Sequence, residues 1–275
     1  MMSAKTIIIT GASDGIGAAA ARKISRLYPE HRLLLVGRNP EKTATVAADT
    51  KADYFLADFE SLGQVRRVAE ELKDHLGSTQ ISALANNAGG AFDGPFPTAD
   101  GFERTWQVNV VAPFLLTSLL RENLEYANVV QTASVANMLM SRFDPNDPNT
   151  FDNFSAERAY GNAKLGDILM TRYFHVHGLN SVAFHPGVLA TNFGKSNSGN
   201  IGKAYSSILS KTFGAPSEGG DNLVFYILGR PGIHFDPGEY YNNKRQPGLQ
   251  RPMAKNVSVA RRLFDDMARQ LNVEW

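Results

Sequence analysis

The chain has 275 residues, of which 43% are hydrophobic and 20% charged, an ordinary composition for a globular α/β protein. Its 28 basic and 27 acidic residues leave a formal net charge of +1, so no overall field favours nucleic acid or an anionic membrane as a partner. Because the chain has no cysteine, a disulfide framework, a thiolate metal site and a cysteine nucleophile are all excluded.

The N-terminus runs from "MMSAK" directly into the apolar stretch "TIIITGAS". This stretch is too short for a signal peptide, and no later segment approaches the roughly 18 apolar residues that a membrane span needs. We therefore expect a cytoplasmic protein.

Short apolar runs recur along the chain between longer amphipathic segments, a pattern typical of strands that alternate with helices. The segment from Ser61 to Leu76 is one such helix, with Ser61 as its expected N-cap. This alternation predicts a Rossmann-type doubly wound parallel sheet in a three-layer α/β/α sandwich, within a single domain over residues 1–275. The expected strands, each buried on both faces, are Thr6 to Thr10, Arg32 to Val36, Asp53 to Ala57, Ile81 to Ala85, Asn128 to Thr132 and Ser181 to His185.

Three segments interrupt the alternation. Gly89 to Gly101 and Ser141 to Glu157 are dense in Gly, Pro, Asp, Asn and aromatic residues, which predicts loops. The segment from Thr191 to Gly214 is polar and rich in Gly and Ser. We interpret it as a substrate flap inserted into the domain.

The first strand leads into "TGASDGIG" at the start of an Ala-rich helix. Glycines at 11, 15 and 17 let the backbone turn tightly and approach a pyrophosphate, which the amides and the positive end of the helix would hold. At the start of a βαβ series this motif predicts dinucleotide binding. Tight packing of a strand against a helix is the alternative.

The residue that follows the second strand bears on which dinucleotide is bound. NAD enzymes carry an acidic residue about 20 positions past the glycines, where it accepts a hydrogen bond from the ribose 2′-hydroxyl. This chain has Arg38 there, and a planar guanidinium suits a 2′-phosphate. The sequence thus favours NADP(H), although an exposed surface arginine is the alternative.

The stretch "AYGNAKL" places Tyr160 four residues before Lys164. Positions i and i+4 share one face of a helix, and an ammonium close to a phenol favours the ionised phenol. The pair is therefore a candidate acid/base. Taken alone, the same spacing is more often two ordinary residues on a helix surface.

Taken together, these motifs resemble the short-chain dehydrogenase/reductase family over nearly the whole chain. Among its branches the chain looks most like the retinol dehydrogenases and protochlorophyllide reductases. The motifs that agree in order are "TGASDGIG", Asp58 in "LADFES", "NNAG" from Asn86 to Gly89, Asn109 in "WQVNVVAPF", Ser134 in "QTASVAN", Tyr160 with Lys164, and "FHPGVLAT". Two departures are Ala163, where many members carry serine, and Thr132-Ala133-Ser134 in place of a double serine.

The resemblance implies that a hydride passes between a nicotinamide and a carbonyl or alcohol carbon. It implies that Tyr160 exchanges the proton on the substrate oxygen and that Lys164 lowers the Tyr160 pKa and holds the nicotinamide ribose. Ser134 would hydrogen-bond the substrate oxygen, and Asn109 would hold a water, in a helix that Pro113 is close enough to kink. With the glycine turn and Arg38, the cofactor-binding set is Gly11, Ser13, Asp14, Gly15, Ile16, Gly17, Arg38, Asp58, Asn87, Ala88, Gly89, Tyr160, Lys164, Pro186, Gly187, Val188 and Thr191.

Two further groups of side chains bear on metal binding and on the substrate. His175 and His177 stand at i and i+2 and do not share a helix face, so we predict no metal site. Apolar side chains in or beside the loops favour an apolar substrate, although an equally good interpretation is that they anchor the loops. They are Phe92, Phe96, Met138, Met140, Phe143, Phe151 and Phe193.

We therefore expect an NADP(H)-dependent oxidoreductase that acts on a small apolar carbonyl or alcohol compound. A non-catalytic NADP(H)-binding redox sensor that acts through partners is one alternative, and an epimerase or dehydratase on the same scaffold is another. The presence of Asn109, Ser134, Tyr160 and Lys164 together argues against the sensor. From the resemblance, a homodimer through the helices that carry Asn109 and Tyr160 is also expected.

Overall fold

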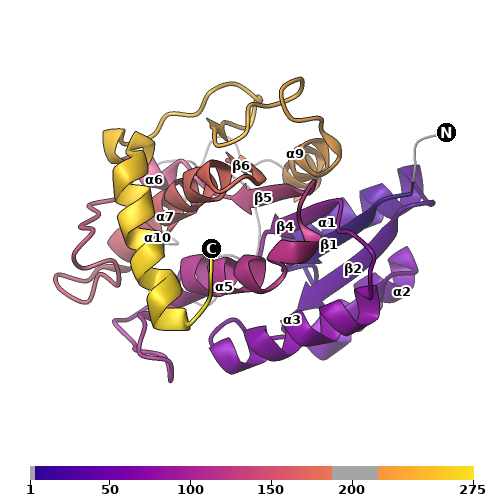
Figure 1. Ribbon diagram of the computed structural model, residues 1–275, viewed down its shortest axis with the longest axis horizontal. Coiled ribbons are helices and arrows are strands. Elements are labelled where there is room, and N and C mark those ends of the chain that lie inside the picture. Colours follow the sequence, from indigo (N-terminus) through magenta and orange to yellow (C-terminus); the bar gives the residue numbers. More distant parts are fainter. Residues whose placement is uncertain (1–3, 188–215) are drawn as a thin grey trace.

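The computed structural model describes residues 4–187 and 216–275 (Figure 1). They contain a seven-stranded sheet of order β3-β2-β1-β4-β5-β6-β7. All paired strands are parallel, and the strand order reverses between β1 and β4, which confirms the predicted doubly wound sheet. The strands are β1 Thr6–Thr10, β2 Arg32–Gly37, β3 Asp53–Leu56, β4 Ala83–Asn86, β5 Asn128–Thr132, β6 Asn180–Phe184 and β7 Tyr240–Tyr241.

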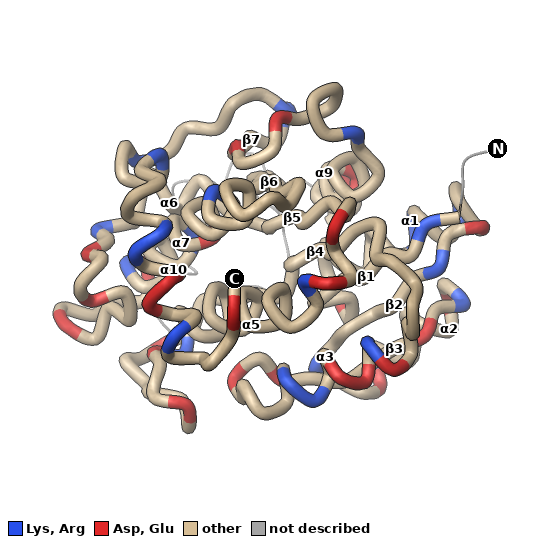
Figure 2. The backbone as a smooth tube through the Cα atoms, in the orientation of Figure 1, with Lys and Arg blue, Asp and Glu red and all other residues tan. Residues whose placement is uncertain are grey.

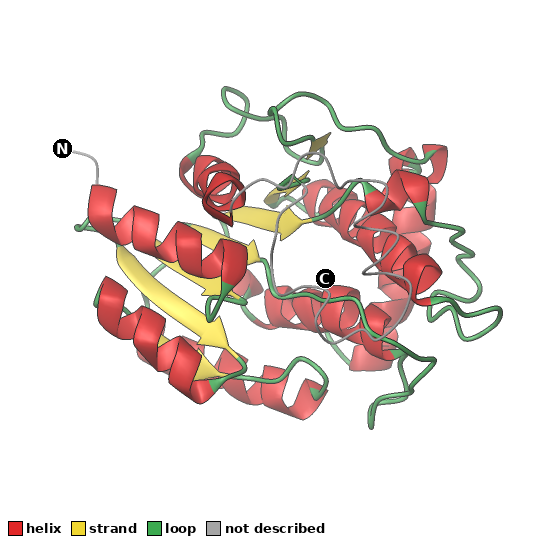
Figure 3. Cartoon of the chain, turned by 180° about the vertical axis from the view of Figure 1, so that it is seen from behind, coloured by secondary structure: helices red, strands yellow, loops and turns green. Residues whose placement is uncertain are grey.

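Helices cover both faces of the sheet (Figure 3). The helices α1 Gly15–Leu27, α2 Pro40–Thr50 and α9 Pro216–Leu228 pack against one face, and α3 Leu62–Leu76, α5 Ala112–Leu119 and α7 Ala156–Val176 pack against the other. The remaining helical segments are α4 Arg104–Trp106, the π-helical turn η1 Gln107–Val111, η2 Arg121–Asn123, α6 Ala136–Leu139, η4 Pro252–Lys255 and α10 Val257–Leu271.

The central strands are apolar because both of their faces are covered by helices. Strands β1, β4, β5 and β6 contain no Lys, Arg, Asp or Glu (Figure 2). The prediction for the third strand was wrong in one respect, since Asp53 and Tyr54 are exposed rather than buried. Strand β3 is the edge of the sheet and pairs with β2 alone, so one side of it faces solvent. Ser61 caps α3 as predicted and accepts a hydrogen bond from the Gln64 backbone N–H.

The C-terminal helix α10 covers the outer side of the layer formed by α5 and α7 (Figure 1). In α7, every residue from 159 to 174 is buried within the single chain. The last residue, Trp275, stacks on Phe114 of α5 and Phe174 of α7, and its indole N–H donates to Ser118 Oγ at 2.7 Å. Consequently, a dimer through α5 and α7 would require α10 and Trp275 to leave this surface.

We accordingly expect a monomer, which departs from the homodimer that the family resemblance suggests. Light scattering coupled to size-exclusion chromatography should give a mass close to the 30.1 kDa of one chain over a wide range of concentrations. A stable species of twice this mass would show that another surface pairs or that α10 moves away.

Candidate active site

The glycine turn after β1 packs so closely against its neighbours that a side chain at Gly11 or Gly17 would clash with them. Gly11 and Gly15 have φ values of +64° and +56°, which favour glycine. A Cβ atom on Gly11 would lie 2.8 Å from the Ala88 Cα atom, and a Cβ on Gly17 would lie 2.5 Å from the Gly11 carbonyl oxygen. The turn, the start of α1 and the segment that follows β4 therefore form one compact cradle, in which Ser13 and Ile16 are half-buried.

Asp14 is the N-cap of α1. Its carboxylate accepts a hydrogen bond from the Gly15 backbone N–H at 2.8 Å. The other carboxylate oxygen pairs with Lys42 Nζ at 3.0 Å. Because Lys42 lies in the first turn of α2, this ion pair connects the glycine turn to the segment that follows β2.

Arg38 follows β2 and lies beside the segment that follows β3. Its guanidinium is 3.3 Å from Glu60 Oε1 and 3.9 Å from Asp58 Oδ1, and 60% of its side chain is exposed. The structure thus brings Arg38 and Asp58 close together beyond the carboxyl ends of β2 and β3. Sequence reasoning missed Lys42 and Glu60, which place a second cation and a further carboxylate in the same region. The spacing of Arg38 and Lys42 on either side of the α2 N-cap was the available signal for the lysine.

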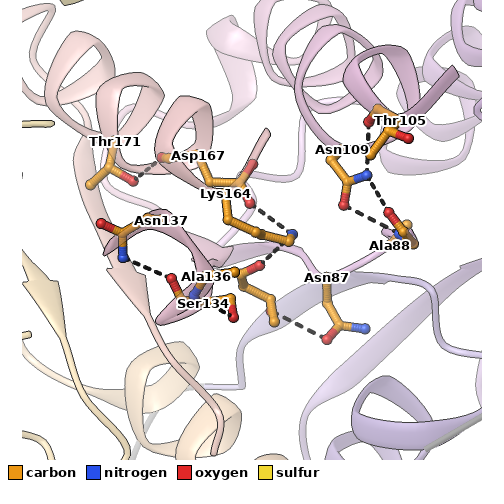
Figure 4. A network of polar contacts seen from close by, with 12 residues as sticks. Asn87, Ala88, Thr105, Asn109, Ser134, Ala136, Asn137, Lys164, Asp167 and Thr171 are labelled. Carbon is orange, nitrogen blue, oxygen red and sulfur yellow. Dashed lines mark hydrogen bonds and ion pairs between the residues drawn. The ribbon is translucent and has the colours of Figure 1, made fainter. Parts of the chain in front are cut away.

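Asn87 and Ala88 are held against β1 by a threonine that sequence reasoning missed. The Oγ1 atom of Thr10 accepts hydrogen bonds from the backbone N–H groups of Asn87 and Ala88, each at 3.0 Å. The Asn87 side chain donates to the Thr10 carbonyl at 3.0 Å. Its Oδ1 accepts from Thr132 Oγ1 at 3.2 Å (Figure 4). Threonine as the last residue of both β1 and β5 was the signal for these contacts.

Asn109 lies in the π-helical turn η1, whose five residues are all buried. Its side-chain amide donates to the carbonyls of Gly90 at 2.7 Å and Thr105 at 2.8 Å, and its Oδ1 accepts from the Gly90 N–H at 3.2 Å (Figure 4). The expected distortion of the helix is present and takes the form of this π turn. Pro113 lies just beyond it and has no N–H to donate to the Asn109 carbonyl.

Lys164 and Tyr160 are both buried on α7, with 5% and 4% of their surfaces exposed. The Lys164 ammonium donates to the Thr132 carbonyl at 2.9 Å and to Asp167 Oδ2 at 2.8 Å (Figure 4). It lies 5.6 Å from the centre of the Tyr160 ring. The interpretation of these two residues as surface side chains is therefore wrong, because the structure buries both. Sequence reasoning missed Asp167, for which the i, i+3 spacing was the available signal.

Ser134 lies beyond the end of β5 and is 2% exposed. Its Oγ accepts a hydrogen bond from the Ala136 N–H at 3.2 Å, and its carbonyl accepts from the Asn137 side chain at 2.7 Å (Figure 4). Ala136 packs in one small apolar cluster with Tyr160. The segment that carries Ser134 is thereby brought next to Tyr160.

Pro186 and Gly187 follow β6, and Gly187 has a φ of +102°. His185, next to them, is buried, and loss of solvation lowers its pKa to about 4, so the imidazole is neutral at pH 7. Other sites predicted from the sequence lie outside the described residues. They are Val188, Thr191, Phe193 and the rest of the expected flap from 191 to 214.

The described apolar side chains expected to border the site fall into three groups, one of which is Met140, partly buried against the cluster that contains Tyr160. Phe92 is buried with the Arg104 guanidinium 4.5 Å from its ring centre, and Phe143 stacks on Trp106 at 5.7 Å. These two phenylalanines anchor the loops to the body of the protein. Those that keep a third or more of their surface exposed are Phe96, Met138 and Phe151.

His175 and His177 lie at the C-terminal end of α7, as predicted. Within residues 4–187 and 216–275, no three His, Asp or Glu side chains are close enough together to hold a metal ion. In the same residues, no helix is both long and apolar enough to cross a membrane.

Many of the predicted site residues that the structure describes lie at the carboxyl ends of the parallel strands. They are the glycine turn, Arg38, Asp58, Asn87 to Gly89, Lys164 and Pro186. Ligands of open α/β sheets bind at this edge, beside the point where the strand order reverses. The residues fit a dinucleotide, because a cradle that a Cβ atom would fill admits close approach of phosphate to backbone. Beside it lie a phenol, an ammonium and a hydroxyl, the groups needed for proton transfer.

Comparisons with known proteins agree with this geometry. The family model described as short chain dehydrogenase matches residues 5–146. The "Putative daunorubicin C-13 ketoreductase DnrU" of Streptomyces sp. (strain C5) is 36% identical over 276 residues, which cover 96% of this chain and 91% of that protein. Retinol dehydrogenase 14 of Homo sapiens is 29% identical over 294 residues, with 96% and 85% covered. These relatives confirm the resemblance to the retinol dehydrogenase branch.

Among solved structures, NADPH-bound carbonyl reductase from chicken fatty liver superposes with a TM-score of 0.66. The match covers 91% of this chain and 100% of that chain at 18% sequence identity. At this identity the match supports the fold alone.

Proposed function

The chain belongs to the short-chain dehydrogenase/reductase family of oxidoreductases, and we propose that it is an NADP(H)-dependent enzyme that interconverts a small apolar carbonyl compound and its alcohol. The family uses nicotinamide cofactors and acts on small molecules. The observation that carries the proposal is the buried Lys164 ammonium beside Tyr160 at the carboxyl end of the sheet. The names of the two relatives, a ketoreductase and a retinol dehydrogenase, support a ketone or an alcohol as the substrate.

When bound, the nicotinamide supplies or accepts the hydride. In carbonyl reduction, Tyr160 donates its phenolic proton to the substrate oxygen as negative charge develops there. The Ser134 hydroxyl donates a hydrogen bond to the same oxygen and stabilises that charge. The Lys164 ammonium stabilises the phenolate that Tyr160 becomes, and Asn109 holds the loop at Gly90 against its own helix.

We propose that Arg38 and Lys42 hold the 2′-phosphate of NADP(H). Arg38 stands where NAD enzymes carry an acidic residue. The N-terminus of α2, which carries the positive end of the helix dipole, lies next to it. Glu60 accepts from the Arg38 guanidinium and Asp58 lies near it, which keeps that side chain at the site. A phosphate would form a charge-assisted contact with the exposed face of the guanidinium.

The experiment is a titration of the protein with NADPH and with NADH, followed by quenching of Trp106 and Trp275 fluorescence. We expect tighter binding of NADPH, and we expect Arg38→Ala to weaken NADPH binding about 10- to 100-fold while leaving NADH binding nearly unchanged. Arg22→Ala is a matched control, because Arg22 on α1 pairs with Asp49 on α2 and both side chains are about half exposed.

The outcomes separate the alternatives. If the wild type binds neither cofactor, the proposed function fails. If it binds NADPH tightly but reduces nothing in a broad carbonyl panel, a redox sensor is the better interpretation. Conversion of a substrate without net consumption of NADPH would point to an epimerase or a dehydratase.

A further inference from the structure

A buried ion pair lies directly behind the proposed catalytic residues. Lys164 Nζ and Asp167 Oδ2 are 2.8 Å apart, with 6% and 4% of their side chains exposed. Both residues belong to the part of α7 in which every residue is buried. Figure 4 shows the Lys164 ammonium paired with Asp167. The charge that lies 5.6 Å from the centre of the Tyr160 ring is therefore one half of an ion pair and not an isolated charge.

Burying this carboxylate has a free-energy cost. Loss of solvation raises the pKa of Asp167 to about 6, even though the adjacent Lys164 ammonium acts in the opposite direction. A neutral side chain of similar shape would avoid the cost of burying this carboxylate, but it would leave the Lys164 ammonium buried without a counter-charge. The charge of Asp167 is therefore next to the ammonium that lies beside the Tyr160 phenol.

In the described part of the chain, Asp167 is the charged partner of Lys164, whose ammonium also donates to the uncharged Thr132 carbonyl. Strands β5 and β6, the turn η1 and helix α6 contain no Lys, Arg, Asp, Glu or His, and His185 beyond β6 is neutral at pH 7. On α7 itself, Glu157 and Arg158 lie in the first turn and His175 in the last turn. The remaining charged or titratable groups of α7, α4, α10 and η4 are bonded elsewhere or lie on α10 and η4, which pack against the C-terminal half of α7. They are Arg104 bonded to Glu60, Arg172 to Glu239 and Tyr173 to Asp265, together with Lys255, Arg261, Arg262, Asp266 and Arg269.

We propose that Asp167 is a positioning residue that fixes the Lys164 ammonium beside Tyr160 and offsets part of its charge, so that Tyr160 remains protonated at neutral pH and is poised to donate its proton. The inference rests on the proposed function and extends it. An isolated ammonium would lower the phenol pKa more strongly than one paired with a carboxylate. The pair therefore favours carbonyl reduction, which needs the protonated phenol, over alcohol oxidation, which needs the phenolate.

Asp167→Asn tests the proposal, because the amide oxygen can still accept from Lys164 Nζ while the negative charge is removed. We expect Tyr160 in this variant to ionise about one pH unit lower than in the wild type. Its ionisation is followed by near-ultraviolet absorbance of tyrosinate, as the difference between each protein and its Tyr160→Phe counterpart. This titration needs no substrate, so it can succeed even if the proposed reaction fails.

Turnover gives a second readout if an alcohol substrate is found. The rise of kcat/KM with pH in alcohol oxidation should move to lower pH by the same amount in Asp167→Asn. Glu239→Gln is the matched control. Glu239 lies 3.1 Å from the guanidinium of Arg172, which is on the same helix as Lys164, so this variant removes a different carboxylate that pairs with α7. It should leave the ionisation of Tyr160 unchanged.

Two results would overturn the proposal. One is an unchanged Tyr160 titration in a folded Asp167→Asn protein, or in Asp167→Ser if the asparagine variant does not fold. The other needs only the wild type and its Tyr160→Phe counterpart, since a wild-type Tyr160 that is already ionised at pH 7 contradicts the proposed role of Asp167.

Discussion

Replacing Tyr160 with phenylalanine is expected to lower kcat/KM for carbonyl reduction by about 10²- to 10⁴-fold, the usual contribution of a positioned general acid. The phenol is 4% exposed and packs in a cluster with Ala91 and Ala136, so removal of its hydroxyl should leave this packing intact. NADPH affinity and thermal stability should therefore stay close to those of the wild type. A loss of turnover without loss of binding would assign the effect to proton transfer.

The measurement is steady-state NADPH consumption with a carbonyl compound found by screening, accompanied by fluorescence titration and thermal unfolding. Tyr126→Phe is the control, because the Tyr126 side chain is exposed, with 77% of its surface accessible. It should retain full activity. If Tyr160→Phe also retained full activity, the proposed mechanism would be wrong.

The sequence predicts the bounds of two central strands correctly, whereas the central strand β4 begins two residues later than the expected run from Ile81. The expected runs Thr6 to Thr10 and Asn128 to Thr132 coincide with β1 and β5, because a strand covered on both faces has to be apolar throughout. The third run has the same kind of composition in "YFL", yet it forms the edge strand β3. Whether a strand lies at the edge or the centre of the sheet depends on its pairing with segments far away in the sequence. A single apolar run contains no information about that pairing. Strand β7 was missed because it has two residues.

In the site too, residues close together in the sequence could be predicted, whereas burial and contacts between distant segments could not. The i, i+4 spacing and the family motifs indicated Tyr160 and Lys164, and the structure brings them together on one buried helix. Acidic residues three positions from a lysine are common on exposed helices, so the sequence could not show that Asp167 is buried. The contact between Arg38 and Glu60 joins segments after two different strands and depends on the sheet pairing.

Replacement of Gly17 by alanine is expected to disrupt the nucleotide end of the molecule. The new Cβ would lie 2.5 Å from the Gly11 carbonyl oxygen and 2.7 Å from Asn87 Nδ2. The first contact is with backbone, so the start of α1 has to move away from the glycine turn, at a cost of about 1–3 kcal/mol in the free energy of unfolding. Because the proposed pyrophosphate site lies between these two segments, NADPH binding should weaken about tenfold or more.

Gly63→Ala separates this local clash from the general effect of a methyl group on a helix. Gly63 is in the first turn of α3, and the atom nearest to the added methyl would be Ser61 Oγ at 3.7 Å, an ordinary contact. The methyl restricts the unfolded chain, so this variant should be more stable than the wild type by roughly 0.4–1 kcal/mol. Thermal unfolding and NADPH titration of both variants make the comparison. If Gly17→Ala matched Gly63→Ala in both measurements, close packing at the turn would not be required for cofactor binding.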